Sequence, residues 1–199
     1  NRSNVDGETS IPDFICTTGR AGIDALAAMG YDPVKLIDAG ALRANTFGRL
    51  VHDPVGPVFV AVPFDKKIGT QMLDAIRPLT EQNRNFLVKV HPMTPLDFEE
   101  RPGINRTGIP LDQQPGVSAV LYAATTVGLE AILGGIPTLR FQPEGLVPTD
   151  PTPVGIEIPE TTAENLAMRL DQLKVPPAIK PTSVFSPPDY AVWQKLLTQ

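Results

Sequence analysis

Apolar residues along this chain gather in short uninterrupted runs, and stretches with helical spacing separate these runs. The clearest runs are residues 57–63 (PVFVAVP), 85–90 (NFLVKV) and 117–123 (VSAVLYA). Continuous runs of this kind, rich in β-branched residues, are typical of central strands covered on both faces. Apolar positions from Ile68 to Leu79 recur at helical spacing after the first run. The alternation predicts an open, mostly parallel α/β sheet flanked by helices.

The sequence before residue 57 predicts a smaller unit. Residues 1–11 are polar and predict a flexible lead-in. Residues 12–56 begin with a short apolar run, an amphipathic stretch at 20–30 that ends at glycine, and a second apolar run. We therefore predict a strand-helix-strand unit followed by a linker over 12–56, and one large domain over 57–199.

Weaker signals complete the large domain. The long polar segment 93–116 predicts at most one turn of helix, at residues 96–100. GIEIP, at residues 155–159, predicts a short strand, and Thr161 or Thr162 can cap the helix that follows. The end of the chain predicts an amphipathic helix whose apolar residues pack back on the body: Tyr190, Trp193 and Leu197.

Residues 117–141 follow the order strand, turn, helix and strand, with the turn at Ala124, Thr125 and Thr126. Backbone N–H groups at a helix start are unpaired and carry partial positive charge, so this turn can hold a phosphate. Glu130 follows one turn into the helix. Its carboxylate can reach ligand hydroxyls, as an acidic residue does for ribose in other mononucleotide sites. The alternative is an ordinary βαβ unit with a solvated glutamate.

His91 directly follows the second central strand, and ligands of parallel sheets bind at the carboxyl ends of strands. Its imidazole can donate to a phosphate oxygen and offset charge on a leaving diphosphate. The alternative is a strand-end histidine bonded to a nearby carbonyl. Because the segment after Pro63 and the turn at Thr125 also follow strands, we expect one cleft to contain all three.

Charged residues near these strand ends allow two interpretations each. Lys66 and Lys67 start a helix, where either can touch a phosphate, although paired lysines at a helix start are more often solvated. Arg140 ends the strand that follows the helix of Glu130, and it can pair with Glu144 or reach the ligand.

Composition narrows the range of functions. The net charge of −5 without a long basic run argues against a nucleic-acid surface. The sequence has no apolar run of membrane-spanning length. The single cysteine, Cys16, lies in an apolar context that predicts a buried thiol in a reducing compartment. One cysteine and two distant histidines make a zinc site unlikely to form, so we expect no metal and no cofactor.

Three common motifs of nucleotide-binding proteins and hydrolases are absent from the sequence. It has no phosphate loop ending in Gly-Lys-Ser/Thr and no strand-borne Gly-x-Gly-x-x-Gly. A nucleophile elbow of the form Gly-x-Ser-x-Gly is also missing.

Two segments, NFLVKVHP at 85–92 and TTVGLEAILGGIP at 125–137, resemble the C-terminal, nucleotide-sugar-binding half of GT-B glycosyltransferases, as does a tryptophan-bearing terminal helix. Glu130, Gly135 and Pro137 match the segment of lipid-linked N-acetylglucosaminyltransferases and UDP-N-acetylglucosamine 2-epimerases in which a glutamate binds ribose. The His-Pro pair also resembles bacterial sialyltransferases and capsule polymerases, whose donors carry cytidine nucleotides. The resemblance implies a Rossmann-like donor domain.

Carried over by position, the resemblance implies that His91 is the catalytic residue at the donor phosphate. It also implies phosphate contacts for the hydroxyl pair and a ribose contact for the glutamate. We expect the base to lie against the loop after the first central strand. The expected nucleotide-binding residues are Pro63, Phe64, Lys66, His91, Thr125, Thr126, Gly128 and Glu130, with no metal ligand.

The sequence departs from the family pattern at several positions. Threonine replaces the usual serine in the hydroxyl pair, and Ala124 and Thr125 occupy the positions of two glycines in the epimerases. Thr138 stands where many retaining GT-B enzymes carry a second glutamate, which weakens a match to the retaining families.

The expected function is donor binding in a glycosyltransferase that moves a sugar from a CMP-, CDP- or UDP-linked donor to a surface polysaccharide or glycolipid acceptor. A whole GT-B enzyme needs a second domain, so we expect an N-terminal partner domain that carries the acceptor site. The expected location is the cytoplasm or the inner membrane face. This chain alone should bind nucleotide weakly and transfer no sugar. The alternatives are a sugar-nucleotide epimerase or hydrolase fragment and a non-catalytic α/β interaction domain.

Overall fold

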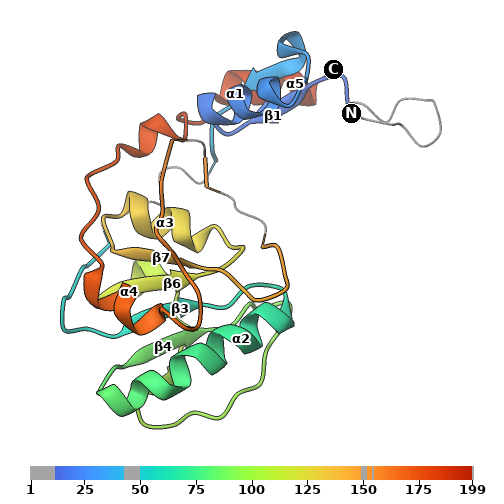
Figure 1. Ribbon diagram of the computed structural model, residues 1–199. Coiled ribbons are helices and arrows are strands. Elements are labelled where there is room, and N and C mark those ends of the chain that lie inside the picture. Colours follow the sequence, from blue (N-terminus) through green and yellow to red (C-terminus); the bar gives the residue numbers. More distant parts are fainter. Residues whose placement is uncertain (1–11, 43–49, 149–151, 154, 199) are drawn as a thin grey trace. The chain divides into compact units, whose positions relative to one another are not determined.

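The computed structural model describes residues 12–42, 50–148, 152, 153 and 155–198 (Figure 1). Contacts divide the chain into a small unit, residues 1–46 with 180–199, and a large unit, residues 47–179. The predicted lead-in at 1–11 and the middle of the predicted linker, 43–49, lie outside the described residues.

The large unit contains the sheet that the apolar runs predict. Its six described strands are all parallel, and they lie in the order β5-β4-β3-β6-β7-β8. The three continuous apolar runs form the central strands β4, β3 and β6. The bounds are β3 Val58–Ala61, β4 Phe86–Lys89, β5 Ile104–Arg106, β6 Ala119–Tyr122, β7 Thr138–Phe141 and β8 Glu160–Thr161.

Helices cover both faces of this sheet, so the predicted open α/β fold is confirmed. Along β3, Val58 and Val60 pack under α2 (Lys66–Ile76) and α4 (Leu166–Gln172) on one face. Phe59 and Ala61 belong to the core on the other face, which α3 (Val127–Leu133) covers. Figure 1 shows α2 and α3 on opposite sides of the strands. Both faces of β3 and β6 are thus buried, which explains why these strands lack charged positions.

Short 3₁₀ helices extend these elements. Arg77–Gln82 (η3) continues directly from α2 and buries Leu79, the last apolar position of the predicted helical run. A second short helix, Leu111–Gln113 (η4), precedes β6.

The segment 93–116 differs from the prediction. It contains β5, which the sequence does not signal, and residues 96–100 form no helix. The Arg106 guanidinium explains the irregular backbone, because it donates to the carbonyls of Leu96 and Phe98 at 3.4 Å each. It also stacks over the Phe98 ring, 4.3 Å from the ring centroid. Arg106 thus helps to fix residues 96–98 of this loop at the sheet edge.

Two boundaries after β7 also differ from the prediction. The predicted strand at 155–159 is irregular, and strand β8 follows it at Glu160–Thr161. Neither Thr161 nor Thr162 caps α4, because Asn165 occupies the N-cap position. The Asn165 Oδ1 atom instead accepts hydrogen bonds from the Thr161 hydroxyl at 2.8 Å and the Thr162 amide at 2.9 Å.

The small unit combines both ends of the described chain. Strands β1 (Ile15–Thr17) and β2 (Leu36–Asp38) form a parallel pair joined by α1 (Arg20–Ala28) and the 3₁₀ helix η1 (Pro33–Lys35), as the sequence predicts. The C-terminal part adds η5 (Pro181–Ser183) and α5 (Tyr190–Leu197).

Specific hydrogen bonds hold the C-terminal segment in the small unit. Trp193 Nε1 donates to the Ala39 carbonyl at 2.9 Å, and the Ser186 hydroxyl bonds to Asp38 Oδ2 at 2.6 Å. Residues 180–198 therefore group with the N-terminal unit, whereas the sequence places them in the large domain.

Three burial predictions for the small unit are wrong. Cys16 is exposed, because side chains alternate along β1 and the neighbouring Thr17 takes the buried position. Tyr190 and Leu197 are also exposed on α5, and Trp193 is the half-buried residue of the three.

Candidate functional site

The structure brings the three predicted site segments to one edge of the sheet. Ala61, the last residue of β3, pairs in register with Lys89 of β4 and with Tyr122 of β6. Because all three strands are parallel, the residues that follow them emerge side by side at their carboxyl ends. These residues are Pro63 and Phe64 after β3, His91 after β4, and the turn 123–126 after β6. We call this the carboxyl edge.

His91 and Phe64 contact each other at this edge. Their ring centroids lie 5.4 Å apart with an interplanar angle of 77°, an edge-to-face arrangement. His91 is half-buried, and the Phe64 side chain is 60% exposed. A partly exposed aromatic ring held in place by a neighbouring ring is available to a planar ligand.

The hydrogen bond of His91 fixes its tautomer. The Met93 backbone N–H donates to His91 Nδ1 at 3.3 Å, so Nδ1 is the unprotonated nitrogen of the neutral ring. The proton then resides on Nε2, which can donate to an anionic oxygen. The alternative interpretation has His91 bonded to a nearby carbonyl. In the described structure, the partner of Nδ1 is instead the Met93 backbone N–H.

The turn 123–126 has a strained backbone. Ala124 has a φ of 49°, in the left-handed region that residues with a β-carbon rarely adopt. Such a conformation costs about 1–3 kcal/mol, and residues of this kind cluster at ligand sites, where the surrounding structure fixes them. A strained turn of this kind is consistent with a ligand-binding role.

Thr125 and Thr126 lie at the start of α3. The Thr125 hydroxyl accepts from the Val127 amide at 3.4 Å, a long hydrogen bond. Thr126 occupies the N-cap position but makes no side-chain cap hydrogen bond within the described part of the chain, and its side chain is exposed. Its hydroxyl therefore remains accessible at the carboxyl edge.

Gly128 supports the site by packing. It is buried, and a β-carbon at this position would lie 2.3 Å from Tyr122 Cε1 and Cζ. The Tyr122 hydroxyl lies 3.3 Å from the Thr152 hydroxyl, and burial raises the pKa of this phenol above its ordinary value of 10.0. The missing side chain of Gly128 thus allows α3 to lie directly on the Tyr122 ring.

Glu130 lies in the first turn of α3 and is half-buried. Its backbone N–H donates to the Thr126 carbonyl at 3.0 Å. This places the residue one helical turn from the exposed Thr126 hydroxyl, as the sequence predicts.

Lys66 and Pro63 flank a second helix start, that of α2. Asp65 caps this helix, because its Oδ1 atom accepts from the Lys67 amide at 2.7 Å and from the Ile68 amide at 3.4 Å. A carboxylate already occupies this helix terminus and disfavours a phosphate there. Pro63 is buried and Lys66 is exposed, so the lysine side chain is the part of this loop that can reach a ligand.

The structure adds a contact that the sequence does not signal. Gln71 of α2 donates from Nε2 to the Glu144 carbonyl at 3.1 Å, and the Glu144 amide donates to Gln71 Oε1 at 2.7 Å. This pair ties the loop after β7 to α2 beside a cavity of about 720 Å³, which Gln142 and Glu164 also line. No sequence pattern shows that the side-chain amide of Gln71 bonds to the backbone of Glu144, because the two residues are far apart in the chain.

Arg140 has a partner that the sequence does not predict. Its guanidinium pairs with Glu160 of the neighbouring strand β8. Register explains the choice, because Arg140 and Glu160 are paired residues of adjacent parallel strands.

The described residues form neither a metal cluster nor a membrane-spanning helix. Among them, no group of three or more His, Cys, Asp or Glu residues could hold a metal ion. None of the helices within the described ranges is both long and apolar enough to cross a membrane.

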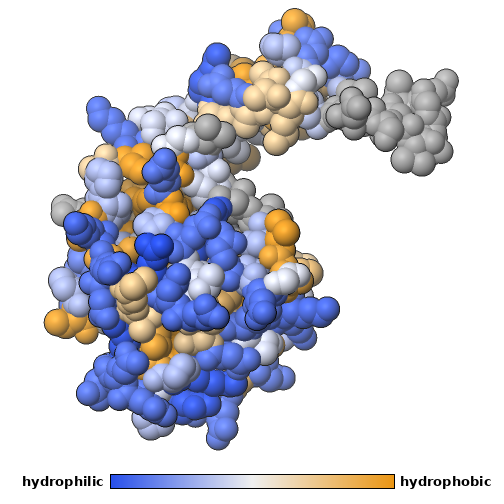
Figure 2. Space-filling model, viewed as in Figure 1, coloured by the Kyte–Doolittle hydropathy of each residue, from blue (hydrophilic) through white to orange (hydrophobic). Residues whose placement is uncertain are grey.

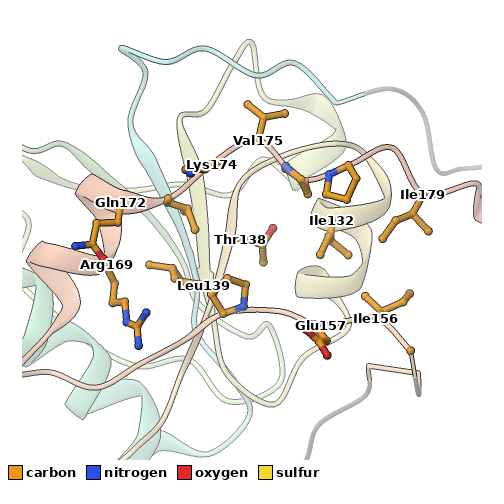
Figure 3. Close-up of a pocket in the computed structure, with 15 residues that line it drawn as sticks. Ile132, Thr138, Leu139, Ile156, Glu157, Arg169, Gln172, Lys174, Val175 and Ile179 are labelled. Atoms are coloured by element: carbon orange, nitrogen blue, oxygen red, sulfur yellow. The ribbon is translucent and has the colours of Figure 1, made fainter.

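A second cavity, of about 780 Å³, lies away from the carboxyl edge (Figure 3). Residues of β7, α3 and α4 line it together with the segments 155–159 and 173–179. No pattern in the sequence predicts this cavity.

Comparisons with known proteins show similarity at the level of structure. No protein-family model matches this sequence. No curated protein matches it either. The solved structure of the Methanocaldococcus jannaschii UDP-GlcNAc 2-epimerase, in complex with UDP-GlcNAc and UDP, superposes with a TM-score of 0.55 at 12% identity. It covers 94% of this chain and 61% of that chain.

Two further structures are similar over shorter stretches. The Rickettsia bellii UDP-N-acetylglucosamine 2-epimerase has a TM-score of 0.45 at 16% identity, with 65% of this chain and 42% of that chain covered. The wall teichoic acid polymerase TagF has a TM-score of 0.44 at 13% identity, with 81% and 49% covered. The chain thus spans less than two thirds of the length of each of these proteins.

The large unit has a Rossmann-like α/β fold, as the sequence predicts, and the superposed epimerase shares this fold. At 12% identity, the superposition establishes the fold alone.

Proposed function

We propose that this chain is the donor-binding part of a glycosyltransferase that uses a CMP-, CDP- or UDP-linked sugar. The observation that carries the proposal is the meeting of Phe64, His91 and the strained turn at Ala124 on three adjacent strand ends. Parallel α/β sheets bind their ligands at this edge. One aromatic face, one N–H donor and one helix start are the groups that a base and a phosphate require.

Each group has a defined role in the proposed complex. The base stacks on the exposed Phe64 ring, beside Pro63 and Lys66, since aromatic faces bind any nucleobase. His91 Nε2–H, Thr125 and Thr126 contact the phosphate. Glu130 binds the ribose hydroxyls from the first turn of α3, and Gly128 keeps that turn close to β6.

The chemistry proposed for this chain is stabilisation of the leaving nucleotide. In sugar transfer, an acceptor oxygen attacks the anomeric carbon while the bond from that carbon to the phosphate oxygen breaks. Negative charge then grows on the phosphate oxygens, and a fixed N–H donor lowers the barrier by binding that charge. His91 is therefore the proposed catalytic residue, and it acts by electrostatics and hydrogen bonding.

The acceptor belongs to a different part of the enzyme in this proposal. A surface polysaccharide or glycolipid acceptor would bind to an N-terminal partner domain, and the complete enzyme would act in the cytoplasm or at the inner membrane face. The chain spans 61% of the epimerase on which it superposes, which fits a donor domain that needs a partner.

Two other functions make different predictions. A sugar-nucleotide epimerase or hydrolase fragment would share the nucleotide site and prefer a uridine nucleotide, like the ligands of the superposed epimerase, so that a preference for a cytidine nucleotide favours the glycosyltransferase. A non-catalytic α/β interaction domain would bind none of these nucleotides.

Calorimetric titration with CMP, CDP, UDP and GDP tests the proposal. We expect measurable binding of a pyrimidine nucleotide that weakens in His91→Ala and Glu130→Ala while both variants stay folded. His52→Ala is the matched control, because His52 pairs with Val117 near the amino end of β6. If no nucleotide binds, or if both site variants bind like the unmodified chain, the proposal is wrong.

A further inference from the structure

The cavity of about 780 Å³ between β7, α3 and α4 has a polar side and an apolar side. In the view of Figure 3, Arg169, Gln172 and Lys174 lie on the same side of it, with the Arg169 guanidinium at the lower part of the view and the Lys174 ammonium at the upper part. Ile132, Ile156 and Ile179 lie on the other side. A volume of this size, lined mostly by apolar side chains with a few polar groups, is typical of a small-molecule pocket.

The two cations of the polar side lack partners. Within the described residues, neither Arg169 nor Lys174 forms an ion pair or a side-chain hydrogen bond. The acidic residues of the same region are already engaged, since Asp171 pairs with Arg84 and Glu160 pairs with Arg140. The remaining carboxylate of the pocket, Glu157, lies beside Ile156 and across from Arg169 in Figure 3.

The polar side of the pocket is positively charged, whereas the whole chain has a negative net charge. The chain carries a net charge of −5, and yet the polar side of this pocket presents two cations that have no ion-pair partner among the described residues. A planar guanidinium and an ammonium are groups that bind a carboxylate or phosphate.

The segment 173–179 forms one wall of the pocket and leaves apolar surface exposed. Val175, which lines this pocket, is 57% exposed and also lines neighbouring cavities of about 760 Å³ and 340 Å³. Figure 2 shows hydrophobic side chains gathered along this part of the visible face. An elongated apolar group can therefore enter from the surface along the segment.

We propose that this pocket binds a single-chain anionic amphiphile, with its acyl or alkyl chain against Ile132 and Ile179 and its carboxylate or phosphate on Arg169 and Lys174. The site is distinct from the proposed nucleotide site, because Thr138 in its wall begins β7 and lies at the amino end of that strand. The proposal does not depend on nucleotide binding.

Calorimetric titration with octanoate, decanoate, octyl phosphate and decyl phosphate below their micelle concentrations tests this site. We expect binding that tightens about fourfold for each added methylene group, because each buries more apolar surface. Inorganic phosphate should bind far more weakly, and decyltrimethylammonium, with the same chain and the opposite charge, should not compete. The preference between carboxylate and phosphate identifies the head group.

Charge reversal separates this site from non-specific binding. We expect Arg169→Glu with Lys174→Glu to weaken binding at least about tenfold. The exposed Arg101 and Lys195 provide the control, because Arg101→Glu with Lys195→Glu changes the net charge equally outside the pocket. Val175→Asp, at an exposed wall position that should leave folding intact, should also weaken binding. The proposal is overturned if no amphiphile binds, if chain length has no effect, or if both double variants bind alike.

Discussion

The backbone of Gly128 lies against the ring of Tyr122, so that a β-carbon on residue 128 would lie 2.3 Å from two ring carbons. The contact joins the first turn of α3 to the last residue of β6. It sets how closely the helix approaches the sheet, and through the helix it sets the position of Thr126 and Glu130.

Replacing this glycine should destabilise the large unit. We expect Gly128→Ala to lower the free energy of unfolding by about 1–3 kcal/mol, because the ring is fully buried and cannot move aside. Urea denaturation measures the effect. Gly108→Ala is the matched control, since a β-carbon there would meet no atom within 4 Å. A change in Gly128→Ala no larger than in this control would contradict the packing role.

Stability should fall in alkaline solution through Tyr122. Burial raises the pKa of its phenol above 10.0, so above pH 10.0 the unfolded chain loses this proton while the folded chain keeps it. The unfolded state then binds fewer protons, and the free energy of unfolding falls by up to about 1.4 kcal/mol per pH unit until the folded-state pKa is reached.

Tyr122→Phe isolates this effect. The variant should lose less stability than the unmodified chain between pH 9 and pH 11, as measured by urea denaturation at each pH. All other titrating groups are shared, so they cancel in the difference between the two proteins. At pH 8 the same comparison reports the Thr152 hydrogen bond, worth about 0.5–1.5 kcal/mol. Parallel pH curves for the two proteins would show that Tyr122 is not the group responsible.

The two helix starts at the carboxyl edge should respond differently to mutation. Asp65→Ala removes the cap of α2 and should cost about 0.5–2 kcal/mol of stability. Thr126→Ala should change stability by less than about 0.5 kcal/mol, since this side chain makes no cap hydrogen bond in the described structure. Thermal unfolding measures both. Under the proposed function Thr126→Ala still weakens nucleotide binding, so a silent Thr126→Ala in both assays would remove Thr126 from the site.

Phe64 should contribute to nucleotide binding more than to folding. Its ring is exposed, and stacking of a base on such a ring is worth about 1–3 kcal/mol, or about five- to 150-fold in affinity. We expect Phe64→Ala to weaken calorimetric binding of the preferred nucleotide at least about fivefold, and to lower thermal stability by no more than the loss of the edge contact with His91. Val55→Ala, at an exposed apolar position ahead of β3, serves as the control. Equal affinities for the two variants would exclude base stacking on Phe64.

The central strands could be predicted because each comes from a continuous run of apolar residues. Val58 to Ala61 are all buried, and a run without polar positions has no other stable place than the middle of a covered sheet. Once these strands are parallel, their order places His91, Phe64 and Thr125 at the same edge. The location of the candidate site therefore follows from the strands alone.

Other features depend on partners that no local pattern specifies. Strand β5 buries only Ile104, so its sequence carries no period, and pairing with β4 decides its conformation. Arg106 holds residues 96–98 through their backbone carbonyls, which every residue possesses. Arg140 pairs with Glu160 because of strand register, which a single sequence does not reveal.

The grouping of residues 180–198 with residues 12–42 determines the order in which the chain can fold during synthesis. The large unit is continuous in sequence, so its parallel sheet can form as soon as residues 47–179 have left the ribosome. The small unit needs Trp193 to reach the Ala39 carbonyl, and Trp193 follows the whole large unit in the sequence. Strands β1 and β2 are therefore synthesised before the large unit but obtain their complete packing only after it has been made.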